Sequence, residues 1–213
     1  DESTPGASLP GSGSEGQATS ADPPAGPAGA ISVTARDDAN QPVPARVRVE
    51  APGFARVGYA DASGRATVPV PPGTYSASVS RGIEYDAYSA QNVSVGDNQT
   101  AGLSATLTRV VDTSGWISLD PHLHSEMSVD SVIPLDTRLR SVAAEGVEVA
   151  VSSDHDFVVD YNDVIADLGL AAHLATIVGN ESSSLQIGHI NAWPLVVEPA
   201  LPGGGAVRWA GHD

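Results

Sequence analysis

The sequence predicts a multidomain chain, with an all-β sandwich followed by an α/β domain. Between residues 30 and 109, short stretches alternate apolar with polar residues, and turn-forming residues separate them, as in small antiparallel β domains. After residue 111, strand-like apolar stretches alternate with segments of helical period, as in folds built on a parallel sheet. We therefore expect a tether over 1–28, a sandwich over 29–110 and an α/β domain over 111–213.

The composition excludes several classes of function. The formal net charge is −16, lysine is absent and the ten arginines are scattered, so we expect no nucleic-acid partner. No apolar stretch approaches the roughly 18 residues that span a bilayer, so no transmembrane segment is expected. Cysteine is also absent, which excludes disulfides and thiolate metal sites. His, Asp and Glu remain as the candidate metal ligands.

Residues 1–28 consist almost entirely of Gly, Ser, Pro, Ala, Thr and acidic residues. Such a segment buries too little apolar surface to offset its ordering entropy, which predicts a disordered tether. Tethers of this kind often follow a secreted or lipid-anchored N-terminus. We therefore expect an extracytoplasmic protein with a possible lipid anchor upstream of residue 1, and a simple disordered tail stays open as the alternative.

The β-sandwich is predicted from the alternation of half-buried strands. Turn signals such as DDANQP, DASGR and PPGT separate the strands, and no helical period intervenes. The six expected strands are ISVTAR, ARVRVE, RATVPV, TYSASVS, QNVSV and LSATLT.

The region 30–109 resembles the carboxypeptidase regulatory-like (transthyretin-like) sandwich. The resemblance lies in a Pro-containing loop before the second strand, an Asp-x-x-Gly-Arg turn and the Pro-Pro-Gly-Thr-Tyr entry to a later strand. Modules of this family are usually spacers or docking platforms, so the resemblance implies a fold and no chemistry.

The α/β domain is predicted as strand, helix, strand, helix and strand. WISLDPHLH, VEVAVSS and LATIVGNE are the expected strands, and residues 134–145 and 160–172 are the expected helices. A complete α/β barrel needs about 200 residues, so we expect only its first half here. The segment 187–197 is then expected to be an unpaired edge strand.

Candidate metal ligands follow the ends of these strands. Alternate residues of a strand share a face, so His122 and His124 are expected to point the same way. Asp130 lies in the loop after them, His155 follows the second strand and Glu181 ends the third. Buried polar groups need partners, and a metal cluster would supply them.

The pattern resembles the polymerase-and-histidinol-phosphatase (PHP) superfamily, and within it the carbaryl-hydrolase-like branch of metallohydrolases. Its elements are D-x-H-x-H-S-x-x-S-x-D, then D-H, G-x-E and G-H-x-N, spread over residues 120–191. The resemblance implies a centre of two or three divalent ions (Zn, Mn or Fe), with Glu181 bridging two of them. The ligands that it implies are His122, His124, Asp130, His155, Glu181 and His189.

Other polar residues are expected to support the site or the fold. Asp154 is expected to orient an imidazole, with capping of the following segment as the alternative, and the same two interpretations apply to Asp120. Asn191 could contact substrate or satisfy a turn. Four residues are expected to be structural. Asp156 and Asp160 would start the next helix, His173 would act as a cation near a helix end, and Ser128 would hydrogen-bond locally. His212 has no assignment.

The expected activity is metal-dependent hydrolysis of a small-molecule phosphoester by metal-activated water. Carbamate or amide hydrolysis by the same fold is the first alternative, and a non-catalytic surface protein with a degenerate PHP domain is the second. The histidine and Asp-x-His that complete the family pattern do not follow His189. We therefore expect the C-terminal half of the PHP domain to be missing, and this chain alone to be inactive.

Overall fold

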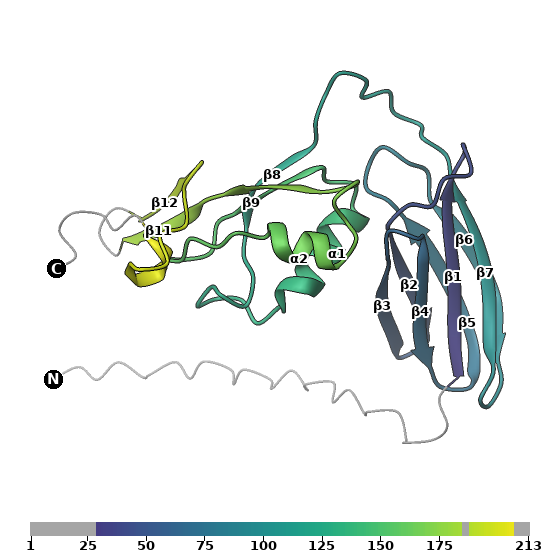
Figure 1. The fold of residues 1–213 in the computed structure, drawn as a ribbon. Coiled ribbons are helices and arrows are strands. Elements are labelled where there is room, and N and C mark those ends of the chain that lie inside the picture. Colours follow the sequence, from purple (N-terminus) through teal and green to yellow (C-terminus); the bar gives the residue numbers. More distant parts are fainter. Residues whose placement is uncertain (1–28, 185–187, 207–213) are drawn as a thin grey trace, which may run out of the picture.

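The computed structural model describes residues 29–184 and 188–206. The β-sandwich lies at one end of these residues, and a region built on a parallel sheet lies at the other (Figure 1). The predicted tether (1–28), Ile187 and His212 lie outside the described residues. Within the described part of the chain, no helix has the length and apolar character needed to cross a membrane.

Seven strands form the sandwich, in two facing sheets. One sheet has the order β4-β1-β7, in which β1 pairs parallel with β7, and the other has the order β3-β2-β5-β6, all antiparallel. The strands are β1 (Gly29–Asp37), β2 (Ala45–Ala51), β3 (Phe54–Ala60), β4 (Arg65–Val70), β5 (Gly73–Ser80), β6 (Tyr88–Val95) and β7 (Thr100–Leu107).

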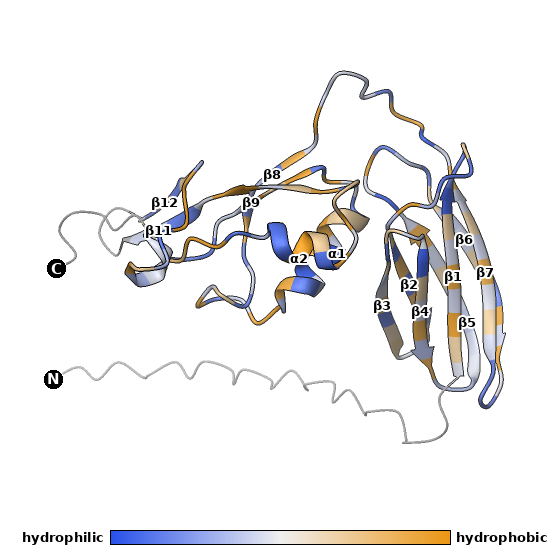
Figure 2. Ribbon diagram, in the orientation of Figure 1, coloured by the Kyte–Doolittle hydropathy of each residue, from blue (hydrophilic) through white to orange (hydrophobic). Residues whose placement is uncertain are grey.

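Alternation of residue type builds the core of the sandwich. Along β1, buried residues such as Ile31 and Val33 alternate with half-buried ones, and β4 alternates in the same way. Figure 2 shows the apolar bands interrupted by polar ones along these strands. All six predicted strands are present. The strand β3 was not predicted, because it lies at a sheet edge and its residues do not alternate in burial.

The Asp-x-x-Gly-Arg turn between β3 and β4 has a clear physical basis. The Asp61 carboxylate accepts hydrogen bonds from the Ser63 amide (2.8 Å), the Ser63 hydroxyl (2.6 Å) and the Arg65 amide (3.1 Å). Gly64 has a positive φ of 74°, and a Cβ there would lie 2.2 Å from the carbonyl oxygen of Ala35. The turn therefore requires both the short acidic side chain and glycine.

The second region is centred on a parallel sheet of order β10-β9-β8. Its elements are β8 (Leu119–Leu123), α1 (Leu135–Ala144), β9 (Val149–Ser152), α2 (Asn162–Asp167) and β10 (Ala175–Val178). The helix α1 follows Pro134, ends before Gly146 (φ 74°) and buries Leu139 and Val142. The pairing of β8 with β9 shifts register between Asp120 and Leu123, where Pro121 has no amide proton to donate.

Two predicted elements differ in the structure. The second helix was expected over 160–172, but α2 ends at Asp167, and a positive φ of 68° at Gly169 turns the chain away from the helix. The segment expected to be an unpaired edge strand contains β12 (Gly188–Ala192), which pairs antiparallel with β11 (Asn180–Ser184). The strand β11 begins one residue after β10, and an isolated parallel bridge between Glu181 and His155 joins the hairpin to the chain after β9. The described chain closes with the short 3-10 turn Pro202–Gly204.

The two regions contact each other through α1. The buried guanidinium of Arg81, just after β5, donates from Nη1 to the carbonyl oxygens of Pro44 (2.7 Å) and Ala143 (2.8 Å). Arg46 pairs with Glu145 at 3.1 Å. A Cβ on Gly82 would lie 2.0 Å from the Glu145 carbonyl oxygen, so the backbones pack closely here. The sandwich thus supports the helix that follows β8.

Candidate metal centre

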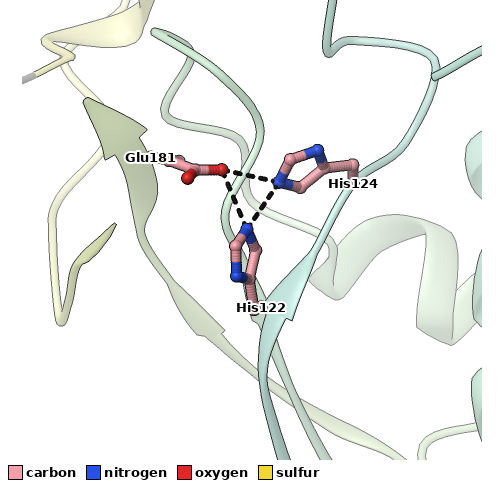
Figure 3. Close-up of side chains that lie close together, drawn as sticks. All are labelled: His122, His124 and Glu181. Atoms are coloured by element: carbon pink, nitrogen blue, oxygen red, sulfur yellow. Dashed lines mark hydrogen bonds and ion pairs between the residues drawn. The ribbon is translucent and has the colours of Figure 1, made fainter. Parts of the chain in front are cut away.

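Two histidines and one glutamate converge beside the end of β8. The Nε2 atoms of His122 and His124 lie 3.0 Å apart, and they lie 2.9 Å and 2.8 Å from Oε2 of Glu181 (Figure 3). His122 belongs to β8, His124 follows it directly and Glu181 belongs to β11. Ligand atoms bound at right angles to one ion, each about 2.1 Å from it, lie roughly 3 Å apart, which matches this triangle.

Hydrogen bonds alone do not make all three contacts among these two Nε2 atoms and Oε2 of Glu181 favourable. An ionised carboxylate only accepts, so both Nε2 atoms would have to carry a proton to bond to Glu181. The two N–H groups would then face each other across 3.0 Å. Removing either proton leaves a nitrogen lone pair against the carboxylate oxygen. A cation at the centre makes all three contacts favourable, so the donor set fits a metal ion.

A second group of potential ligands shares His124. Nδ1 of His124 lies 3.0 Å from Oδ1 of Asp130, and Nε2 of His155 lies 3.4 Å from Oδ2 of Asp130. The hydrogen bonds from His124 and Ser128 lower the pKa of Asp130 to about 2, against the small opposing effect of burial. Asp130 is therefore a carboxylate at neutral pH, and this group too could hold a metal ion.

The hairpin completes a third group. Nδ1 of His189, on β12, lies 3.2 Å from Oε1 of Glu181, and Nε2 of His155 lies 3.6 Å from Oε2. The imidazoles of His122, His124, His155 and His189 follow one another with centroids 4.9, 4.7 and 4.6 Å apart. The structure thus brings together all six residues that the sequence singled out, in three overlapping groups that could each hold an ion.

Glu181 belongs to two of these groups and is buried, with 5% of its side chain exposed. Burial works to raise the pKa of Glu181, but the hydrogen bond from His122 and the charges of His122, His155 and His124 outweigh it, so the pKa is lowered. The two carboxylate oxygens face different histidines, Oε2 toward His124 and Oε1 toward His189. One side chain can therefore serve two neighbouring ions.

Asp154 differs from the expectation that it orients an imidazole. Its carboxylate is fully buried and accepts from the Ser125 amide (2.6 Å), the Ser125 hydroxyl and the Tyr161 hydroxyl (2.7 Å). Burial, and then the charge of Asp154, raise the pKa of Tyr161, which keeps that hydroxyl protonated. Asp154 thus holds the backbone just after His124 through a network that the sequence reading missed.

His155 is held by hydroxyl groups on both sides. Its amide donates to Oγ of Ser128 at 3.0 Å, and its Nδ1 lies 2.8 Å from Oγ of Ser183. Ser128 therefore hydrogen-bonds, as expected, although to a residue distant in sequence. Asp156 does not start a helix: it adopts a positive φ of 56°, and its carboxylate accepts from the Ser183 amide at 3.0 Å. This bond helps to fix the hairpin against the end of β9.

The remaining predicted residues have these places. Asp120 accepts from the amide of His122 at 3.1 Å. Asn191 is exposed and lies opposite Glu181 in the β11–β12 register, so the two side chains share a face. Asp160 accepts from the Asn162 amide at 2.9 Å, at the start of α2. His173 is not the expected helix-end cation, because burial and the charge of Arg81 lower its pKa.

No protein-family model and no curated protein matches this sequence. Among solved structures, the chain is similar to the TIE protein of Bacillus anthracis (18% identity, TM-score 0.33, covering 39% of this chain and 17% of that one). It is also similar to the major pilin subunit BcpA of Bacillus cereus (19%, 0.30, 38% and 30%). A third is a type II cohesin–X-dockerin complex from Acetivibrio cellulolyticus (18%, 0.31, 38% and 58%).

The chain spans less than two thirds of the length of each of these structures. Likenesses this distant identify neither the family of the sandwich nor the place of the protein in the cell. The inference about function therefore depends on the side chains themselves.

Proposed function

We propose that the region after residue 111 is the first part of a PHP-type metallohydrolase that cleaves phosphoesters with two or three divalent ions. The observation that carries this proposal is the position of Glu181, a buried carboxylate whose two oxygens face different histidines. An arginine does not neutralise this buried carboxylate, because no Arg pairs with Glu181 in the described part of the chain. Imidazole and carboxylate ligands suit Zn²⁺, Mn²⁺ or iron.

The three groups define which residues would hold the ions. One ion would lie with His122, His124 and Glu181, another with His124, Asp130 and His155, and another with His155, Glu181 and His189. A neutral imidazole donates one lone pair, so each shared histidine would bind one ion at a time. Because neighbouring groups share residues, any two of them together contain five of the six candidate ligands. Such ions make water nucleophilic near neutral pH and withdraw charge from the oxygens of an ester.

The rest of the chain prepares these residues. Ser128 and Ser183 fix the position and the ring orientation of His155, and the Asp154–Ser125 contact fixes the chain after His124. Because the supporting groups are buried, their hydrogen bonds are little weakened by competing water. The site is thereby held rigid by residues that would not touch an ion themselves.

The sandwich, in this proposal, is a carboxypeptidase regulatory-like module that spaces or docks the hydrolase. Among its described residues it contains no histidine, and its buried residues are apolar apart from Arg81. An extracytoplasmic location, secreted, periplasmic or lipid-anchored, remains our prediction from the composition of residues 1–28. A small molecule is the expected substrate.

Metal stoichiometry tests the proposal directly. The chain is dialysed against Mn²⁺, Zn²⁺ or Fe²⁺, and bound metal is measured by mass spectrometry. We expect two or three ions per chain. Binding of no ion would reject the proposal.

Activity is then measured on the protein at the length that its gene encodes, with an aryl phosphomonoester, an aryl phosphodiester and an aryl carbamate. Metal-dependent release from a phosphoester supports the proposal. Release from the carbamate alone would favour the alternative hydrolase. Bound metal without any release would favour a non-catalytic surface protein.

A further inference from the structure

An open cavity of about 440 Å³ lies on the sandwich, but a cavity of about 400 Å³ beside the candidate metal centre has the more informative lining. Its walls come from the end of β8 and from Arg138 of α1, whose side chain bonds to the backbone just after β8. The lining residues are Asp120, His122, Leu123, His124 and Arg138. A molecule in this cavity would contact two candidate metal ligands and one arginine at the same time.

Arg138 is held in place by one hydrogen bond. Its Nε donates to the carbonyl oxygen of His124 at 2.8 Å, which ties α1 to the chain just after β8. A guanidinium has five N–H donors, and four of them are on the terminal nitrogens. Those two nitrogens make no hydrogen bond to any other residue in the described ranges. Arg138 is therefore anchored by its inner nitrogen and retains a fork of donors for a ligand.

The charge of Arg138 is unusual at this place. The chain has 26 acidic residues and ten basic ones, and the candidate centre itself contains Asp130 and Glu181. Among the described residues that line this cavity, Arg138 is the one basic residue apart from the histidines. Asp120 carries the opposing charge there, and its Oδ1 accepts a hydrogen bond from the amide of His122.

We propose that Arg138 and this cavity form a subsite for the phosphoryl group of the substrate. A phosphoryl group has enough oxygens to face the His122 and His124 side and to accept two parallel bonds from the guanidinium. A carbamate is neutral and gains little from this charge. The inference rests on the proposed function and deepens it, because the six candidate ligands do not distinguish phosphoester from carbamate chemistry and Arg138 does.

The test measures binding of inorganic phosphate by titration calorimetry, with and without Mn²⁺, and uses acetate as a second ligand. The variants are Arg138→Gln, which removes the charge, and Arg138→Lys, which retains it without the fork. Arg140→Gln is the matched control: it removes the same charge from the same helix, outside the cavity lining. Thermal melting of each variant establishes that it is folded.

We expect Arg138→Gln to weaken phosphate binding roughly 10- to 100-fold. Arg138→Lys should show a smaller loss, and it keeps the test open should Arg138→Gln fail to fold. Arg140→Gln should change binding by less than about twofold. Acetate should bind more weakly than phosphate to the unaltered chain.

Equal losses in Arg138→Gln and Arg140→Gln would overturn the subsite, because the effect would then be one of net charge. Absence of phosphate binding by the unaltered chain, with or without Mn²⁺, would overturn it as well. Failure of the proposed function has a different signature, since the chain would bind no Mn²⁺ while phosphate binding still depended on Arg138.

Discussion

The two regions of the molecule bury different kinds of residue. The sandwich encloses an almost entirely apolar core, with Ile31, Val47 and Val79 fully buried between its sheets. The parallel-sheet region has a smaller apolar cluster around Leu139 and Tyr161. It also contains every buried polar residue among the described ranges except Arg81: Ser125, Ser128, Ser152, Ser153, Asp154, His155, Asn180, Glu181 and Ser182.

This difference indicates two sources of stability. Burial of apolar side chains stabilises the sandwich and does not depend on metal. In the other region, buried polar atoms need partners, and each one left without a partner costs about 1–3 kcal/mol. Among the described residues, both amide atoms of Asn180 and the hydroxyl of Ser182 have no hydrogen-bond partner, whereas beside the sandwich only Nε of Arg81 lacks one. The second region therefore has less stability in reserve, and we expect metal dependence to be confined to it.

The largest expected effect is the loss of metal in Glu181→Ala. This variant removes the carboxylate that two of the three groups share, so metal affinity should fall roughly 1,000-fold or more, about 4 kcal/mol. Equilibrium dialysis with Mn²⁺ measures the loss, and His173→Ala is the control outside the site. Hydrogen exchange should show reduced protection after residue 119 and unchanged protection in β1 to β7. Unchanged metal binding would contradict the role of Glu181.

The second prediction concerns a substitution that destabilises the sandwich and does not touch the candidate metal centre. Gly64→Ala places a Cβ 2.2 Å from the Ala35 carbonyl oxygen at a positive φ, so the free energy of unfolding should fall by roughly 3 kcal/mol. Gly53→Ala is the matched control, because Gly53 has the same φ of 74° with no atom within 4 Å. It should cost about 1 kcal/mol. Equal costs in urea melts would show that the close contact is unimportant.

The third prediction concerns the support of the site. Tyr161→Phe removes one of the donors to the buried carboxylate of Asp154 and should lower the free energy of unfolding by about 2 kcal/mol. It should also weaken metal binding about tenfold, because the chain after His124 loses part of its support. Phe157→Leu is the control, because Phe157 lies in the same segment between β9 and α2. If stability fell and metal affinity did not, Asp154 would serve only the fold.

The smallest expected effect is a pH dependence within the sandwich. Burial works to raise the pKa of Asp61, but its bonds to Ser63 and to the Arg65 amide outweigh burial and lower it below 3.8. Ionised Asp61 therefore stabilises the fold above pH 3.8, and the contribution is lost as pH falls through the lowered value.

Asp61→Asn should destabilise the chain by roughly 0.5 kcal/mol at pH 7, since solvent screens this half-exposed turn. The difference between variant and unaltered chain should shrink as the pH falls below 3.8 and through the lowered pKa of Asp61. Urea melts from pH 7 to pH 2 measure it. A difference that stayed constant over this range would mean that the charge of Asp61 does not contribute.

Local sequence patterns were sufficient to predict most of the strands and the first helix. Alternation identified six of the seven sandwich strands, and helical period identified α1 almost to its ends. The miss at β3 has a physical cause: Phe54–Ala60 is an edge strand with both faces partly exposed, so no alternation marks it. The second helix was overextended, because the period continued past Gly169 while the backbone did not.

By itself, the sequence placed His122, His124, His155 and Glu181 at strand ends, because the two-residue period of a strand and the position of its end are local properties; the full set of candidate ligands came from the family resemblance. Only the tertiary structure decided what those residues face. His189 reaches Glu181 because β12 folds back on β11, and Asp154 bonds to Ser125, 29 residues away, instead of to an imidazole. Arg138 enters the cavity through the packing of α1 against β8. The partner of a buried polar group is set by contacts between distant segments, and no local periodicity encodes them.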